Sequence, residues 1–219
     1  DTIEYKNLAV GLRYTVEGTL MDKATGEAIT DEKGEAITAK TSFTPKAPDG
    51  TVNITFRFKA DDMEGKTLVA FEVLTTKNVK GEDTPVASHE DIEDEDQTVH
   101  FPKVRTTAHS EEGDDEFLAS DPIKLIDTVA YENLIPGKSY TLIGTVMDKD
   151  SRTLLGKIKP LTVDGEVVTA TVTFTPENAN GTVDVVFEFN GEQLGNKSLV
   201  VFETLYDTDS RVVGTHEDE

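Results

Sequence analysis

The chain of 219 residues contains one sequence pattern twice, and this duplication limits what the chain can fold into. A repeat of this length makes each copy one folding unit. About 100 residues is also a usual size for a single domain. The sequence therefore predicts two tandem domains of the same fold. The clearest matches are residues 1–8 with 127–134, 68–72 with 199–203, and 88–91 with 215–218.

The two predicted domains are not equally complete. We place domain 1 at residues 1–103 and domain 2 at residues 104–219. The connection between the copies gives domain 2 a lead-in segment that domain 1 lacks. Domain 1 has a closing segment with Gln97, whereas the second copy ends at Glu219 before any such glutamine. We expect domain 2 to lack its last strand, and the abrupt start and end are typical of a fragment.

Alternation of apolar and polar side chains dominates each copy. Period-two alternation rich in Val, Thr, Phe and Tyr is typical of half-buried strands in an antiparallel sheet. Turn signals such as Pro48-Asp49-Gly50 separate the alternating segments, and no segment has a sustained helical period. The sequence predicts an all-β fold of two immunoglobulin-like β-sandwich domains. The alternating segments are residues 14–21, 51–58, 140–147 and 182–189.

Composition excludes several classes of function. The net charge of -22, with 43 acidic and 21 basic residues, argues against nucleic acid and anionic membranes as partners. The absence of cysteine excludes disulfides, zinc–thiolate sites and thiol nucleophiles. No apolar run has the roughly 20 residues that a membrane-spanning helix needs, and no signal peptide begins the chain.

A set of polar residues recurs among the apolar core positions. Taken singly, each member has an ordinary explanation: the aspartate is a turn residue, the glutamate faces solvent, and the histidine lies on the surface. Recurring glycines such as Gly18 and Gly144 indicate bulges or turns. The joint recurrence of the polar set indicates a shared site, although shared descent of the two copies also explains it. The set is Thr2/Thr128, Asp22/Asp148, Glu72/Glu203 and His89/His216, with Gln97 in the first copy only.

These residue types suit an acyl transfer within the protein. A threonine hydroxyl becomes a useful nucleophile when a base such as histidine removes its proton. Two buried carboxyls that lie close together share one proton and can donate a hydrogen bond at neutral pH. A glutamine side chain supplies the acyl group. The product would be a Thr–Gln ester with release of ammonia, and the reaction needs neither a cofactor nor a metal.

Four motifs carry a resemblance to a known family: Asp-Thr-x-x-Tyr, Met-Asp-Lys, Val-x-Phe-Glu and His-Glu-Asp followed by Gln-Thr-Val. Together they resemble the ester-bond-forming immunoglobulin-like repeats of Gram-positive surface adhesins. The resemblance implies an ester between Thr2 and Gln97, with His89 as base and Asp22 and Glu72 as the proton-sharing acids. In the second copy it marks Thr128 as an unpaired nucleophile, with Asp148, Glu203 and His216 as its catalytic set.

The resemblance also implies a function. We expect stalk domains of an extracellular, cell-wall-anchored adhesin, with neighbouring repeats as partners and a Gln-bearing strand as a complement to domain 2. The ester would form once per domain, so the chain is not expected to be an enzyme with turnover. Gln193 aligns with a loop residue of the first copy and does not replace the missing glutamine.

Three alternatives stay open. The first is a plain β-sandwich that binds or supports without a cross-link. The second is a hydrolase that uses the Thr, His and acid set on an external substrate; no Gly-rich oxyanion loop supports it. The third is calcium binding by the acidic loops, although no EF-hand pattern is present.

Overall fold

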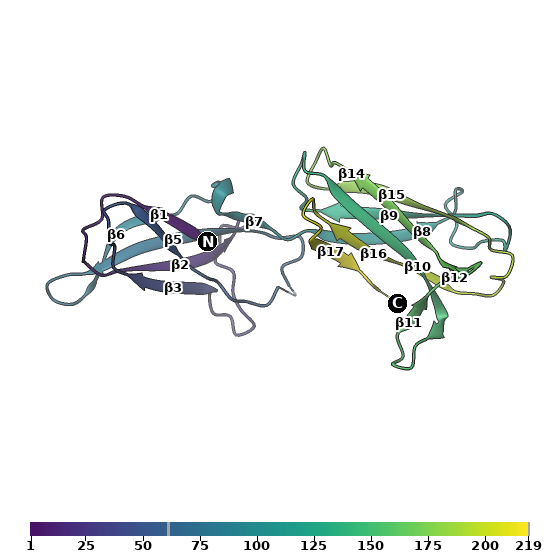
Figure 1. The fold of residues 1–219 in the computed structure, drawn as a ribbon, viewed down its shortest axis with the longest axis horizontal. Coiled ribbons are helices and arrows are strands. Elements are labelled where there is room, and N and C mark those ends of the chain that lie inside the picture. Colours follow the sequence, from purple (N-terminus) through teal and green to yellow (C-terminus); the bar gives the residue numbers. More distant parts are fainter. Residues whose placement is uncertain (61, 219) are drawn as a thin grey trace. The chain divides into compact units, whose positions relative to one another are not determined.

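The computed structural model describes residues 1–60 and 62–218, and its regular structure there is almost entirely β-strand (Figure 1). The chain divides into two compact units, Asp1–His100 and Phe101–Glu219, so the division lies three residues before the predicted boundary after residue 103. A one-turn 3-10 helix, η1 (Glu95–Gln97), is the sole helical element of the described residues. None of the described helical structure could cross a membrane. The all-β fold predicted from the alternation is confirmed.

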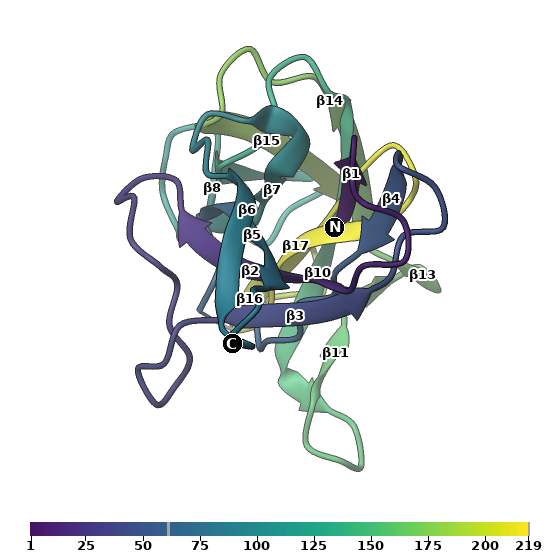
Figure 2. The same ribbon diagram turned by 90° about the vertical axis from the view of Figure 1, so that its left-hand side faces the viewer.

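Unit 1 combines a five-stranded antiparallel sheet with a separate pair of strands (Figures 1 and 2). The large sheet has the order β3-β2-β5-β6, and β7 pairs with β5 beyond the end of β6. The separate pair is β1 with β4. The strands are β1 (Thr2–Tyr5), β2 (Tyr14–Asp22), β3 (Thr38–Phe43), β4 (Gly50–Asn53), β5 (Thr67–Lys77), β6 (Asp83–His89) and β7 (Thr98–His100).

Unit 2 contains a five-stranded sheet, a three-stranded sheet and a short hairpin. The larger sheet has the order β11-β10-β16-β17, with β14 also paired to β10, and the smaller sheet has the order β15-β9-β8. The strands are β8 (Lys103–His109), β9 (Ile123–Glu132), β10 (Tyr140–Arg152), β11 (Ile158–Pro160), β12 (Thr162–Val163), β13 (Glu166–Val167), β14 (Thr169–Phe174), β15 (Gly181–Phe189), β16 (Leu199–Tyr206) and β17 (Val212–His216).

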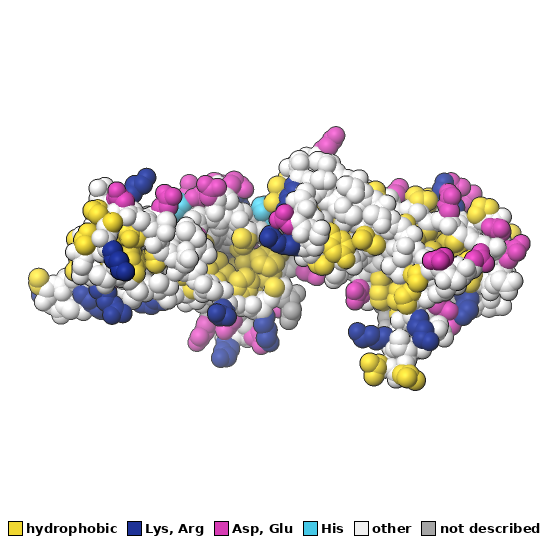
Figure 3. Space-filling model, in the orientation of Figure 1, with side chains coloured by type: hydrophobic (Ala, Val, Ile, Leu, Met, Phe, Trp, Pro, Cys, Tyr) yellow, Lys and Arg dark blue, Asp and Glu magenta, His cyan; other side chains and the backbone are white. Residues whose placement is uncertain are grey.

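An apolar core lies between the two main sheets of unit 2. Strand β9 supplies Leu125 and Val129 from the smaller sheet, and β10 supplies Leu142 and Val146 from the larger one. All four are buried because alternate side chains of each strand point inward. This is the arrangement of a β-sandwich, in which the inner faces of two sheets interdigitate. Acidic side chains are scattered in small groups over the visible surface of each unit (Figure 3).

The two units differ in the strands that flank the common core. In unit 2, β8 pairs with β9 over its whole length. No strand of the described residues pairs in this way with β1, the counterpart of β9. In unit 1, β7 pairs with β5 from Thr67 to Val69. In unit 2, the part of β16 that corresponds to this part of β5 has no such partner among the described residues. Strand β17 pairs with β16 only from Glu203 onward.

Candidate functional site

Strand β9 brings a carboxylate into the core of unit 2. Its buried positions alternate regularly, so Asp127 lies on the same face as the apolar Leu125 and Val129. Asp127 faces Glu203 of β16, and both residues are 0% exposed. No donor among the described residues makes a hydrogen bond of good geometry to any of the four carboxyl oxygens. Buried carboxyls without such partners are costly to keep ionised, which points to a chemical role.

Burial and mutual contact set the protonation of this pair. Burial, together with the close approach and the charge of Asp127, raises the pKa of Glu203 to about 9. Burial also raises the pKa of Asp127, although contact with Glu203 and with the Thr106 hydroxyl acts in the opposite direction. At neutral pH Glu203 therefore keeps its proton and can donate it in a hydrogen bond. The two carboxyls form a proton-sharing pair.

A threonine and a histidine complete the site of unit 2. Thr106 of β8 lies on the inward face, two residues after the buried Val104, and its hydroxyl contacts the Asp127 carboxyl. His216 of β17 pairs through its backbone with Glu203, and its charge would act on Asp127. A threonine, a histidine and two acids thus meet at the place where β8 and β17 approach each other.

Thr128, the predicted nucleophile of the second copy, lies on the other face of β9. Its hydroxyl donates to the Asp184 carboxylate at 2.7 Å, and the His109 ring nitrogen Nε2 lies 3.0 Å from the same oxygen. Because Asp127 points inward, alternation turns Thr128 away from Asp127 and Glu203. Thr128 therefore lies apart from the acid pair, and the threonine of unit 2 that lies against this pair is Thr106.

Asp148 does not join the acid pair either. Glu203 lies opposite Gly144 on β10, so Asp148 is four residues further along, about 13 Å away. Its carboxylate accepts a hydrogen bond from Lys197 at 2.9 Å and another from the Asp150 amide at 3.0 Å. Burial acts to raise the pKa of Asp148, but these contacts lower it on balance. The predicted pairing of Asp148 with Glu203 is corrected to Asp127 with Glu203.

The same correction applies to Asp22 in unit 1. Glu72 lies opposite Gly18, so Asp22 again stands four residues away along β2. The Asp22 carboxylate accepts a hydrogen bond from the Ala24 amide at 2.9 Å and lies 3.9 Å from the Lys66 ammonium. It closes a turn at the end of β2 rather than sharing a proton with Glu72.

Unit 1 keeps Glu72 and His89 together. Glu72 is 3% exposed, and burial raises its pKa to about 7. One nitrogen of His89, Nδ1, lies 3.9 Å from Glu72, and the other, Nε2, lies 3.0 Å from Asp94. Asp94 also caps η1 by accepting a hydrogen bond from the Asp96 amide, as a residue before a helical turn often does. Asp94 therefore connects the histidine to the turn that carries Gln97.

Gln97 reaches Asp1, the counterpart of Asp127. With the carboxamide oriented to donate, its nitrogen lies 3.1 and 3.2 Å from the two Asp1 carboxylate oxygens. Thr2 is exposed and pairs with Asn53 on the outer side of β1, in the place that Thr128 has on β9. The predicted Thr2–Gln97 cross-link does not fit this geometry, because alternation separates Thr2 from Asp1.

The comparison with protein families agrees with this chemistry. One family description, "T-Q ester bond containing domain", matches residues 1–101 and again residues 102–219. The chain belongs to this family. Each of the two units is therefore a T-Q ester bond domain, a structural domain type named for a threonine–glutamine cross-link. No curated protein matches the chain.

Solved structures similar to these T-Q ester bond domains include a bacterial adhesin from Mobiluncus mulieris. That adhesin is described as containing intramolecular disulfide, isopeptide and ester bond cross-links. Two crystal forms are 17% and 18% identical to the chain, with TM-scores of 0.43 and 0.42, over 53% of each chain. A β-glucuronidase from Bacteroides uniformis is 9% identical over 98% of this chain and 25% of its own, with a TM-score of 0.33. The chain thus spans about half of the adhesin.

Comparison of the two copies of the T-Q ester bond domain does not identify two residues of the candidate site, Thr106 and Asp127. Thr106 lies in the lead-in segment, which occurs in one copy only, so comparison of the copies gives no signal for it. Asp127 does recur, as Asp1, but stands beside the more conspicuous threonine. The alternation of Asp127 with Val129 and Tyr131 was the signal that could have placed it on the inner face.

Proposed function

We propose that the chain forms part of the stalk of a bacterial cell-surface adhesin, in which each domain is locked by an ester between its first and last strands. Membership of the T-Q ester bond family supports the cross-linking chemistry. The observation that carries the residue assignment is the buried Asp127–Glu203 pair with the Thr106 hydroxyl against it. In this proposal the reacting threonine of unit 2 is Thr106.

The side chains have distinct roles in the proposed reaction. His216 takes the proton of the Thr106 hydroxyl as its oxygen attacks the side-chain carbonyl carbon of a glutamine on the closing strand. Protonated Glu203, held by Asp127, donates a hydrogen bond to the carboxamide and stabilises the charge that develops there. The C–N bond then breaks, the amide nitrogen takes up a proton, and ammonia leaves. The threonine becomes an ester.

Unit 1 contains the acyl-donor side of the same chemistry. Gln97 is the electrophile, and its carboxamide is already hydrogen-bonded by Asp1. Glu72 and His89 occupy the places of Glu203 and His216, because each glutamate pairs through its backbone with its histidine. Asp94 orients His89 and holds the turn of Gln97. Its threonine would come from a strand in the position of β8.

The cross-link suits a mechanical role outside the cell. Force on a linear array of domains enters at one terminal strand of each domain and leaves at the other. An ester between these strands carries the load covalently, and unlike a disulfide it survives reduction. The reaction occurs once per domain and produces no turnover. Neighbouring repeats are the proposed partners, and a cell-wall-anchored surface is the proposed location.

Intact mass of an extended chain tests this function. The sequence of residues 93–101 is appended after Glu219, so that the glutamine follows His216 at the spacing of unit 1. The extended chain should lose one ammonia, and Thr106→Val should retain it while keeping the shape of the side chain. An unchanged mass for the extended chain would favour the plain β-sandwich instead. Release of product from an added ester or amide would favour the hydrolase.

A further inference from the structure

The Met-Asp-Lys motif recurs in both units, and its lysine takes no part in the proposed reaction. Lys23 directly follows β2, and Lys149 has the same register position on β10. The Lys23 amide donates to the Thr67 carbonyl oxygen at 2.9 Å, and the Lys149 amide donates to the Ser198 carbonyl oxygen at the same distance. The backbone of the motif is therefore fixed in the same way in both units, and the two lysine side chains leave from equivalent positions.

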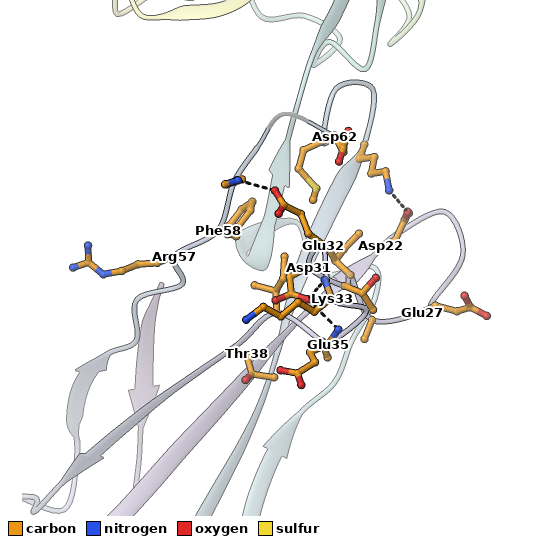
Figure 4. A pocket seen from close by; sticks show the side chains of 18 of the residues that line it. Asp22, Glu27, Asp31, Glu32, Lys33, Glu35, Thr38, Arg57, Phe58 and Asp62 are labelled. Carbon is orange, nitrogen blue, oxygen red and sulfur yellow. Dashed lines mark hydrogen bonds and ion pairs between the residues drawn. The ribbon is translucent and has the colours of Figure 1, made fainter.

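The aspartate of the motif shapes the backbone around the lysine. The Asp22 carboxylate accepts a hydrogen bond from the Ala24 amide at 2.9 Å, so it spans Lys23 in a short turn, and the aspartate of unit 2 makes the same contact. Figure 4 shows Asp22, where a dashed line marks its contact of 3.9 Å with the Lys66 ammonium. The aspartate thus has partners other than the lysine beside it in the motif.

The Lys23 ammonium contacts the acidic turn, residues 93–97, which carries Gln97. It lies 2.7 Å from a Glu95 carboxylate oxygen and 3.4 Å from one of Glu93. The lysine side chain is 20% exposed, so its aliphatic stem lies against the domain. The hydrogen bond between the two side chains raises the pKa of Lys23 and lowers the pKa of Glu95. The contact joins the end of β2 to η1, two residues before the glutamine.

The acidic turn carries a charge that opposes its place in the domain. Residues 93–96 are four consecutive acids, and the glutamine after them lies against the Asp1 carboxylate. Like charges in such proximity repel one another. His89 of β6 lies 3.0 Å from Asp94, and Lys23 contacts the turn from the end of β2. The turn is therefore held from two strands.

The strand after the turn returns to the same place. Strand β7 follows Gln97 and pairs with β5 from Thr67 onward. Thr67 is also the residue whose carbonyl oxygen accepts the hydrogen bond of the Lys23 amide. The Thr98 hydroxyl donates to the Asp94 carbonyl oxygen at 2.6 Å and fixes the end of η1. The glutamine thus lies in a short loop that is tied to Lys23 on both sides.

We propose that Lys23 in unit 1, and Lys149 in unit 2, is a positioning residue whose ammonium draws the acidic turn onto the domain and presents the following glutamine to the acids of the site. The inference rests on the proposed function and adds a residue to it. The lysine acts through the turn and not on the reacting atoms. This role gives a reason for the acidic spacer between the histidine and the glutamine, and for the recurrence of Met-Asp-Lys.

The rate of ammonia loss from the extended chain tests the role of Lys149. The appended segment carries copies of Glu93, Glu95 and Gln97 at the spacing of unit 1. Lys149→Met should slow the loss about three- to tenfold at low salt, because two charge contacts are removed. Lys149→Arg keeps the charge and should react at nearly the wild-type rate. Lys157→Met, at an exposed position, is the matched control.

Ionic strength separates positioning from a general loss of stability. Raising the salt from about 0.05 M to about 0.5 M should slow the extended wild-type chain and leave Lys149→Met almost unchanged, since screening acts on the contact that the variant lacks. Exchanging the charges gives a second check. Lys149→Glu should react slowly, and Glu95→Lys in the appended copy should restore its rate.

The full chain offers a test that does not depend on the ester. The Gln97 amide donates to the Asp94 carbonyl oxygen at 3.3 Å within the acidic turn. Lys23→Met should make hydrogen exchange at this amide about three- to tenfold faster, because the turn opens more often. Lys40→Met removes an exposed ion pair of 2.9 Å elsewhere in unit 1 and is the control.

Two results with the extended chain would overturn the proposal. If Lys149→Met reacts as fast as the wild type at low salt, the lysine does not position the glutamine, although the proposed function stands. If Lys149→Arg is as slow as Lys149→Met, the charge is not the cause. A wild-type extended chain that keeps its ammonia contradicts the proposed function instead. Unchanged exchange at Gln97 in Lys23→Met would then show separately that the lysine does not hold the turn.

Discussion

Glu203 is a buried acid whose proton is held by its surroundings. The native state keeps this proton up to pH about 9, whereas the unfolded chain releases it near the ordinary value of 4.5. Between these pH values the native state binds more protons, so the free energy of unfolding falls as pH rises. The buried acid pair therefore lowers the free energy of unfolding in this pH range, as expected for residues that have a chemical role.

The change Glu203→Gln tests this linkage. The variant should gain stability relative to the wild type as pH rises from 5 to 8, by up to about 1.4 kcal/mol per pH unit, because glutamine cannot ionise. Denaturant unfolding at several pH values measures the effect, and Glu166→Gln at an exposed position is the control. A difference between wild type and variant that does not change with pH would contradict the protonation of Glu203.

The two aspartates of unit 2 should respond differently to amide substitution. In the extended chain, Asp127→Asn should abolish or strongly slow the loss of ammonia, because it removes one member of the acid pair. Asp148→Asn should leave the loss intact and lower stability by about 1 kcal/mol, because it weakens the contact with Lys197. Intact mass over time separates the two. If both variants lost the reaction equally, Asp148 would also take part in the reaction, and the account would be contradicted.

Individual site residues were predictable from the sequence to different degrees. Glu203 and His216 both have counterparts in the first copy, and the structure brings both of them close to Asp127. The recurrence of Asp148 beside an apolar strand predicts a place in the site, but the sequence does not show that four residues along β10 separate it from Glu203. Its recurrence has a structural reason, since Asp22 and Asp148 each accept a hydrogen bond from the backbone amide two residues further on and lie near a lysine.

At the scale of single elements, β9 shows why sequence comparison selects Thr128 although this residue faces away from the acid pair. The alternation that identifies the strand also decides which residue faces the core, and a shift of one residue exchanges the two faces. Ile123, Leu125 and Val129 fix the inner face, which leaves Asp127 inside and Thr128 outside. The sequence predicts the strand, and the same alternation is enough to predict which of its faces points to the core. The contact between β8 and β17 was not, because it depends on how the two sheets pack.

Strand β10 has a glycine where the site needs space. Gly144 lies within the strand and not at a bulge or turn, which corrects the expectation for this glycine. A Cβ atom there would lie 2.6 Å from the Phe187 ring and 2.7 Å from a Glu203 oxygen. The glycine therefore allows a buried ring and a buried acid to pack against the backbone of β10.

The change Gly144→Ala should destabilise unit 2 by about 1–3 kcal/mol, since the added methyl group overpacks the core. It should also slow ester formation in the extended chain, because Glu203 has to move. Gly195→Ala is the control, since an added Cβ there meets no atom within 4 Å. Thermal unfolding measures the first effect and intact mass the second. Equal stability of the two variants would contradict the close approach.

At the scale of the whole molecule, the two units hold different residues of the proposed reaction. In this proposal, Gln97 of unit 1 is the acyl donor, and Thr106 of unit 2 is the nucleophile. The duplication and the all-β class were readable from the sequence. The position of each reacting residue required the strand order, because β8 and β7 are the elements that the two copies do not share.

The ester should stabilise a whole domain, because it joins the first strand to the last. Joining Thr106 to a glutamine on the last strand closes a loop of about 120 residues, worth about 4–5 kcal/mol in the loop-entropy model. The extended chain should therefore unfold at a higher temperature than its Thr106→Val variant, and it should resist proteolysis longer. Calorimetry on the two chains measures this. Equal unfolding temperatures, with the ammonia lost, would show that the bond forms without stabilising the domain.

Mapping the cross-link in the extended chain is the most direct test of the central claim. Cleavage after Arg105, Lys124 and Lys138 separates the two candidate threonines, because one peptide holds Thr106 and the next holds Thr128. Tandem mass spectrometry of the cross-linked product should find the glutamine peptide joined to residues 106–124 through Thr106. A bond to residues 125–138 through Thr128 would contradict the account.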